Sequence, residues 1–178
     1  MFDIETEHLN IIYYPNPVLL KKCNPIVEFN DQLKEIAKKM IFLMNEHKGV
    51  GLAAPQVGLS IQLFVVSKLA SNTEDDLIIV NPKLNNLKNF TLSKEGCLSM
   101  PQVQGEIKRA NSCILTAQDV NGKEIELQGE DLISFIFQHE TDHLNGISIL
   151  DRMSPGDKIK NKKHLDILRN KWITKVNQ

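Results

Sequence analysis

The sequence predicts an α+β fold in which short, mainly antiparallel strands surround one central buried helix, with a further helix on each side of it in the chain. Three observations favour this fold. Apolar residues recur at helical spacing between residues 33 and 44. Runs of β-branched and aliphatic residues follow, separated by turn-forming residues. The segment from 130 to 145 is again helical but much more apolar, as is typical of a helix enclosed by other elements.

The composition is that of one globular domain with a sizeable core: 178 residues, of which 42% are hydrophobic and 24% charged. The net charge of -1 gives no overall attraction for nucleic acid or an acidic membrane. No apolar run approaches the roughly 18 residues of a membrane span, and MFDIETEHLN lacks the regions of a secretory signal. Three cysteines are too few for a disulfide framework. We therefore expect a cytoplasmic protein with no membrane partner.

The first helix follows an irregular arm that contains Pro15 and Pro17. Asn30 or Asp31 can cap its start, and Gly49 can close its end. The helical spacing between these limits is carried by Leu33, Ile36, Ala37, Met40 and Met44.

The strands are predicted after a glycine-rich turn. They cover 61–67, 77–80 and parts of 87–94 and 106–118. Asn121-Gly122 then indicates a hairpin with a two-residue turn. The central helix follows from about Glu130 to Asn145 and ends at Gly146.

The chain after the central helix is interrupted by Ser154-Pro155-Gly156, and a final helix follows. We divide the chain into a main part, 1–153, and a basic C-terminal helical extension of the same domain, 154–178. The extension has seven lysine and arginine residues against two aspartates. It can be a surface helix packed through Leu165, Leu168, Trp172 and Val176, or a surface that contacts phosphates.

Two histidines lie one helical turn apart in the segment QHETDHLNG. His139 and His143 therefore share a helix face and can reach one metal ion. Glu140 points about 100° away and is better placed to transfer protons than to bind the ion. Two histidines on the buried face of an apolar helix would be costly without partners, so a metal-binding role is favoured over two ordinary polar side chains.

A catalytic metal site of this kind needs a third protein ligand and an open position for water. No residue near Cys23 or Cys113 in the sequence suggests a metal-binding or catalytic role, so both are expected to be small buried side chains. Cys97 stands in the tight segment EGCLSMP, and from the residues alone it and His164 are close rivals. The further candidates are Asp151, Asp157 and Asp166.

The segment GVGLAAPQVG, residues 49–58, has small residues that allow another element to approach its backbone closely. It is not a phosphate-binding loop, because no strand precedes it and no Lys-Ser or Lys-Thr follows. Gln56 is the one side chain in it that can donate a directed hydrogen bond.

Taken together, GVGLAAPQ (49–56), EGCLS (95–99) and HETDH (139–143) resemble the peptide deformylase family, which has GxGxAAxQ, EGCxS and HExxDH in this order. The resemblance extends to YPNPVL (14–19) and the hairpin region. It selects Cys97 over His164 as the third ligand. It implies a hydrolase that removes the N-formyl group from formyl-methionine of newly made proteins and releases formate.

The resemblance also implies the roles of the site residues. One divalent ion is expected on Cys97, His139 and His143, with ferrous iron as the native metal and zinc, nickel or cobalt able to replace it. A water molecule on the ion is the expected nucleophile, and Glu140 the general acid and base. The Gln56 side chain and the Leu98 backbone N–H would stabilise the oxyanion, a donor of this kind being typically worth about 3–4 kcal/mol.

The methionine side chain is expected in an apolar slot. Its predicted lining is Val50, Gly51, Leu132, Phe135 and Ile136.

Around the ligands, Asp142 is expected to pair with Arg109 and brace the helix, and Glu95 to orient backbone. Gln104 departs from the arginine or tyrosine of some family members, which affects only contacts beyond the methionine. The resemblance also makes the ribosome a candidate partner of the basic extension, with a packed surface helix as the alternative. The alternatives are an HExxH metalloprotease with a downstream third ligand and a deformylase-like binding module without catalysis.

Overall fold

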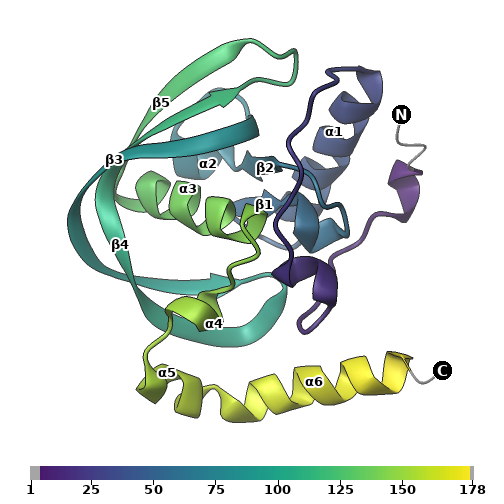
Figure 1. The fold of residues 1–178 in the computed structure, drawn as a ribbon, viewed down its shortest axis with the longest axis vertical. Helices are drawn as coiled ribbons and strands as arrows, with labels where there is room; N and C mark the ends of the chain where they lie inside the picture. Colours follow the sequence, from purple (N-terminus) through teal and green to yellow (C-terminus); the bar gives the residue numbers. More distant parts are fainter. Residues whose placement is uncertain (1–4, 177–178) are drawn as a thin grey trace.

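The structure, a computed structural model, describes residues 5–176, so positions 1–4 and 177–178 of the two expected parts of the chain lie outside it. A strongly curved antiparallel sheet wraps around one central helix, and a long final helix runs along one end of the molecule (Figure 1). The predicted α+β class is confirmed.

The first long helix, α1 (Asp31–Glu46), begins with Asn30 as its cap, because the Asn30 side chain accepts a hydrogen bond from Leu33 N at 3.0 Å. Its apolar face is buried as expected. The Gly49 amide closes the end by donating to Met44 O at 2.8 Å. Gly49 itself does not adopt the left-handed conformation that often ends a helix. Lys48, the residue before it, does so, with φ 54°.

The sheet has five strands in the order β1-β2-β3-β4-β5, with every neighbouring pair antiparallel. The strands are β1 (Gly51–Ala53), β2 (Leu63–Val66), β3 (Leu77–Cys97), β4 (Met100–Gln118) and β5 (Glu124–Glu130). Strand β1 and the 3-10 helix η3 (Ala54–Val57) form where the sequence predicted only a turn.

Strands β3 and β4 are much longer than the short segments predicted from the sequence. The reason is that Asn81, Asn86 and Asn89 adopt positive φ within β3 instead of ending it. The pairing of β3 with β4 shifts register between Val80 and Lys83 and again between Asn85 and Lys88. Such bulges bend a strand, and the bent ribbon curves around the central helix (Figure 1).

The predicted hairpin between β4 and β5 is present, but its turn is longer than two residues. Only Gly122 has positive φ, whereas a type I′ turn needs it at both central residues. The Asp119 carboxylate accepts from the backbone N–H of Asn121 and of Lys123, at 2.8 and 2.9 Å. These bonds stabilise a loop over 119–123 in place of the two-residue turn.

The central helix α3 (Asp131–Leu144) is fixed to β4 by two buried polar side chains. Gln138 accepts from Ala110 N at 2.9 Å and donates to Ala110 O at 2.8 Å. Ser134 Oγ donates to the same carbonyl at 2.8 Å. The helix ends as predicted before Gly146, which has φ 72°.

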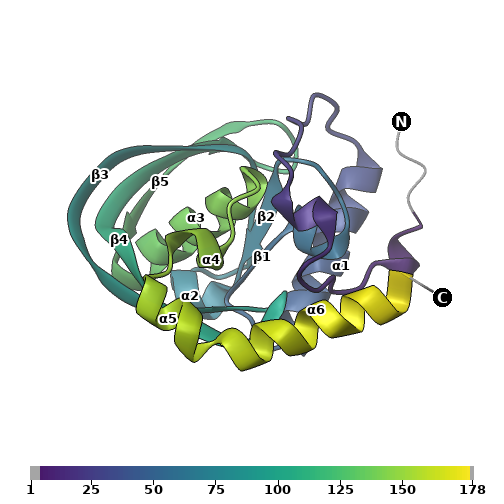
Figure 2. The same cartoon turned by 60° about the horizontal axis from the view of Figure 1, so that its bottom comes forward.

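The remaining helices are short except the last one. They are η1 (Thr6–His8), η2 (Pro17–Leu20), α2 (Lys68–Ser71), α4 (Ile149–Arg152), α5 (Pro155–Lys160) and α6 (Lys162–Val176). Leu165 and Leu168 bury one face of α6 against residues of β4, whereas Val176 at its end is exposed. Figure 2 shows α5 and α6 running along the side of the molecule that is turned forward. Within residues 5–176, no helix has the length and apolar character needed to cross a bilayer.

Candidate metal centre and active site

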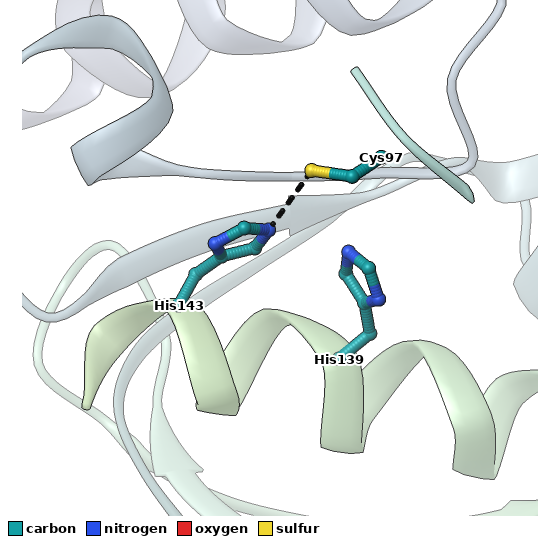
Figure 3. A group of neighbouring side chains, drawn as sticks. All are labelled: Cys97, His139 and His143. Carbon is teal, nitrogen blue, oxygen red and sulfur yellow. Dashed lines mark hydrogen bonds between the residues drawn. The ribbon is translucent and has the colours of Figure 1, made fainter. Parts of the chain in front are cut away.

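Three side chains with metal-binding atoms converge above α3. Cys97 Sγ and one ring nitrogen each of His139 and His143 all lie within 4.8 Å of one another. Both imidazoles project from the helix toward the thiol, and His143 Nε2 is 3.3 Å from Sγ (Figure 3). Among the described residues no other group of His, Cys, Asp and Glu side chains meets this criterion.

The position of Cys97 depends on a tight turn. Strand β3 ends at Cys97 and β4 begins at Met100, and these two residues are partners in the ladder. Leu98 and Ser99 therefore form the tip of a hairpin that holds the thiol over α3. On α3, the spacing of four residues puts His139 and His143 on one face, as the sequence predicted.

These atoms fit a bound transition-metal ion. A thiolate and two imidazoles are the donors that zinc and iron-group metals prefer, and three protein ligands leave one position open. With metal–sulfur and metal–nitrogen bonds of normal length in a tetrahedron, sulfur and nitrogen should be about 3.5 Å apart. The observed 3.3 Å between Cys97 and His143 needs little adjustment.

A buried ion-pair network adjoins the centre. His139 Nδ1 donates to Glu95 Oε2 at 2.9 Å. Arg109 donates to both oxygens of Glu95, at 2.9 and 3.0 Å, and to Asp142 at 2.6 Å. The structure thus contains the predicted pair of Asp142 and Arg109. Glu95 was expected to orient backbone groups, and this expectation is wrong. The Glu95 carboxylate instead binds the side chains of His139 and Arg109.

The pKa values of the ionisable groups at the centre follow from this burial and from their hydrogen bonds. Burial raises the pKa of Glu95, but hydrogen bonds from His139 and Arg109 lower this pKa more, to about 2. Burial opposes protonation of His139, yet its bonds to Cys97 and Glu95 raise the His139 pKa overall. Burial and the neighbouring His139 lower the pKa of His143. The structure therefore keeps Glu95 ionised and His143 neutral, the form in which a histidine binds metal.

Glu140 is buried beside the ligands, and its Oε2 has no hydrogen-bond partner among residues 5–176. Burial raises the pKa of this carboxyl to about 7. The carboxylate lies against the backbone of Gly51, where a Cβ would overlap it. Glu140 can therefore accept and return a proton near neutral pH.

The Gln56 side chain has a fixed orientation. Its Oε1 accepts from Ala53 N at 2.8 Å, so its Nε2 faces Cys97 Sγ at 3.4 Å and Ser99 Oγ at 3.3 Å. The side chain of Leu98 packs over the glycine-rich segment, because a Cβ at Gly49 would lie 2.8 Å from Leu98 Cδ1. The amide N–H of Gln56 and the tip of the β3–β4 hairpin thus lie on the same side of the centre.

A cleft of about 350 Å³ opens at this centre. Its lining includes all five residues predicted for the methionine slot: Val50, Gly51, Leu132, Phe135 and Ile136. Ile136 is buried, whereas Leu132 is 52% exposed and therefore not a core residue. Gln104 also lines the cleft, and its backbone is bonded to the Asn161 side chain.

Some residues of the site could not be found from the sequence. Lys48, Lys94 and Gln102 line the cleft, and Ser99 contacts Gln56. Arg152 donates to both oxygens of Asp142, at 2.6 and 3.1 Å. Of these only Ser99 stood within a motif. The rival ligand candidates Asp151, Asp157, His164 and Asp166 are not part of the metal-binding group.

Known proteins share both the sequence and the fold. The profile of the family described as polypeptide deformylase matches residues 8–159. The chain is 38% identical to the peptide deformylase of Acidobacterium capsulatum over 145 residues, 81% of this chain and 85% of that protein. It is 39% identical to the peptide deformylase of Borreliella burgdorferi over 155 residues, 86% of this chain and 92% of that protein.

Solved structures agree. The crystal structure of Arabidopsis thaliana peptide deformylase 1B with an inhibitor superposes with a TM-score of 0.89 at 34% identity, covering 96% of this chain and 95% of that chain. The peptide deformylase of Plasmodium falciparum gives a TM-score of 0.88 at 34% identity, covering 93% and 98%. All residues of the centre and the cleft lie within the matched segment 8–159.

Proposed function

The chain belongs to the peptide deformylase family of hydrolases, as its three motifs indicate, and we propose that it removes the N-formyl group from the formyl-methionine of newly made proteins. The observation that supports this most directly is the set of metal-binding atoms of Cys97, His139 and His143 within 4.8 Å, with Gln56 and Glu140 beside them. The products are formate and a free amino terminus.

The family is metal-dependent, and Cys97, His139 and His143 would hold one divalent ion. Such an ion lowers the pKa of a water molecule and polarises a carbonyl oxygen. We propose ferrous iron as the ion in the cell. Zinc, nickel and cobalt suit the same sulfur and nitrogen donors.

Glu140 is proposed to transfer the proton. A water oxygen forms a bond to the formyl carbon while Glu140 accepts the water proton. The C–N bond then breaks, and Glu140 gives the proton to the departing amine, so that the carboxylate is regenerated. A pKa of about 7 and burial next to the ligands support this role, because such a group both accepts and donates readily near neutral pH.

Gln56 and Leu98 are proposed to stabilise the oxygen that becomes negative during attack. Gln56 Nε2 already faces the centre, because the other end of the amide is held by Ala53 N. The Leu98 backbone N–H at the tip of the hairpin would be the second donor. Donors fixed in advance need no reorganisation when the charge develops.

The cleft is proposed to select methionine. Leu132, Phe135 and Ile136 come from α3, and Val50 and Gly51 come from the segment between α1 and η3. An unbranched thioether can adapt to such an apolar wall. The half-exposed Leu132 gains cover when a methionine side chain lies against it.

Formate release from formyl-Met-Ala-Ser, by protein purified anaerobically with ferrous iron, tests this function. We expect rapid release, no reaction with acetyl-Met-Ala-Ser and slower release from formyl-Gly-Ala-Ser. A fully metallated protein that leaves the formyl peptide intact would contradict the proposal. Cleavage of an internal peptide bond instead would support the metalloprotease alternative, and ribosome binding without hydrolysis would support the binding module.

The C-terminal extension is proposed to contact the ribosome, in a cytoplasm where formylated chains are made. The support is its seven basic residues against two aspartates and the exposed lysines of α5 and α6. Phosphate contacts weaken as salt screens them. Cosedimentation with ribosomes that does not change between low and high salt would contradict this contact.

A further inference from the structure

We propose that Arg152 of α4 is a positioning residue that holds His139 in its metal-binding orientation through Asp142, Arg109 and Glu95. Arg152 itself touches neither the three ligands nor the cleft. The inference rests on the metal centre proposed above. It adds a residue that lies outside all three motifs and comes from a different helix.

The hydrogen bonds form one continuous series from Arg152 to His139. Arg152 donates from Nη2 to Asp142 Oδ1 at 2.6 Å and from Nε to Oδ2 at 3.1 Å. Arg109 donates from Nη1 to the same Oδ2 at 2.6 Å, and its Nε and Nη2 donate to the two oxygens of Glu95. Glu95 Oε2 then accepts from His139 Nδ1 at 2.9 Å. Positive and negative groups alternate along the series, so each bond orients the next group.

The middle of the network is shielded from water. The side chain of Arg109 is only 3% exposed, and those of Glu95 and Asp142 are also nearly buried. Hydrogen bonds between buried charged groups are strong, and a missing partner in such a network is costly. Among the described residues, Asp142 Oδ1 has Arg152 as its only side-chain donor. Without Arg152, the Asp142 carboxylate would be held on one side alone.

That one-sided carboxylate matters because Arg109 bridges two anions. Its guanidinium binds Glu95 with one edge and Asp142 with Nη1. If Asp142 can rotate, the Arg109 guanidinium can move with it. The pair of hydrogen bonds from Arg109 Nε and Nη2 that fixes the Glu95 carboxylate is then weakened. His139 would then lose the fixed acceptor for Nδ1 that sets its tautomer and ring plane.

The backbone of Arg152 is itself well anchored. Its neighbours Ile149 and Met153 are buried in one apolar cluster with Leu165 and Leu168 of α6. The guanidinium therefore reaches Asp142 from a fixed position, and this position depends on the docking of the C-terminal helix. The network links that helix to the metal centre.

Cobalt binding in competition with a chelator, followed by visible absorption, measures the effect directly. Loss of a side chain that contacts a metal ligand typically weakens metal binding about 10- to 100-fold, and for the more distant Arg152→Met we expect about three- to tenfold. Arg169→Met is the matched control. Arg169 is similarly exposed, 48% against 45%, and is ion-paired to Asp166 within α6; its other polar contact is with the Tyr14 hydroxyl and not with any group of the network.

The proposal is overturned if Arg152→Met binds cobalt like the parent, or if Arg169→Met weakens binding equally. A lower melting temperature of the metal-free variant with unchanged cobalt affinity would show a merely structural role and would also overturn it. If Arg152→Met does not fold, Arg152→Lys replaces it, because lysine keeps the charge but lacks the two-pronged fork. Parent-like cobalt affinity in that variant contradicts the proposal.

The cobalt measurement separates the positioning role of Arg152 from the deformylase activity of the protein. Cobalt affinity is measured without any formyl peptide, and formate release by the parent does not depend on the Arg152 variants. A parent that deformylates while Arg152→Met binds metal normally would reject the positioning role alone.

Discussion

The carboxylate of Glu140 lies against the backbone of Gly51 so closely that a Cβ at this glycine would overlap Oε1. This contact joins the glycine-rich motif to the helix motif. It gives Gly51 a definite purpose, which is to leave room for Glu140, the group proposed to transfer protons beside the three candidate metal ligands.

Replacing Gly51 by alanine should therefore displace Glu140 without removing any ligand. Because a misplacement of about 1 Å can cost a hundredfold in rate, we expect kcat to fall by about that factor while the metal content stays unchanged. The control is Gly156→Ala, where a new Cβ would lie 3.8 Å from its nearest neighbour, Ser154 Oγ. A Gly51→Ala enzyme as fast as the parent would show that the contact is not needed.

Exchanging Gln56 for glutamate should remove the proposed oxyanion donor with little change in shape. One oxygen can still accept from Ala53 N, as Oε1 does at 2.8 Å, but the N–H group is lost. We expect kcat to fall by about a hundredfold to a thousandfold. Steady-state kinetics with the exposed Gln128→Glu as a charge-matched control measures this, and equal rates would exclude Gln56 as a donor.

Metal removal should expose one cysteine to alkylation and leave two protected. Cys23 and Cys113 are buried, and burial raises the pKa of both thiols, so little thiolate forms near neutral pH. We expect iodoacetamide to modify Cys97 in the metal-free protein and to modify none of the three in the loaded protein. Mass spectrometry of digested protein identifies the site, and labelling of Cys97 at equal rates in both forms would argue against its role as a ligand.

Replacing Arg109 by methionine should destabilise the metal-free protein, because Glu95 and Asp142 would keep buried charges with fewer partners. Removing one partner from a buried ion pair typically costs about 3–5 kcal/mol. Urea unfolding at neutral pH measures the loss, with Arg169→Met as an exposed ion-pair control. A loss no larger than that of the control would contradict the importance of the network.

The same network of Arg109, Glu95 and Asp142 affects how the stability of the fold changes at acidic pH. The pKa of Glu95 is about 2 in the fold against a usual 4.5, so the unfolded chain binds the proton first as pH falls. The stability that Glu95 contributes is complete above pH 4.5 and is lost as pH falls toward 2. Arg109→Met should show a weaker dependence over this window.

Local patterns were sufficient for much of the centre. The spacing of His139 and His143 fixes their common face in any α-helix, and Asn30 and Gly146 mark helix ends through their own chemistry. The choice of Cys97 over His164 was different. The residue types and their spacing allowed either one as the third ligand, and only the family resemblance selected Cys97. The reason is that the thiol reaches α3 through a hairpin turn that no local pattern predicts.

Other features depend on contacts between distant parts of the chain. Asparagines that usually end strands became bulges inside β3, since pairing with β4 outweighed their local preference. Glu95 was expected to orient backbone, but its partners lie 14 and 44 residues away. Arg152 had no sequence signal at all, because its contact with Asp142 depends on the way the chain folds back after Gly146 and packs α4 against β3 and β4.

The most direct test of the central claim uses Glu140→Gln, which keeps the size of the side chain and removes its ability to accept a proton. Metal content and formate release from formyl-Met-Ala-Ser would be measured together in this variant and in the parent, both loaded anaerobically with ferrous iron. We expect one ion per chain in both proteins and a rate lowered by about a hundredfold to ten-thousandfold in the variant. A fully loaded variant that releases formate at the rate of the parent would contradict the proposed role of Glu140.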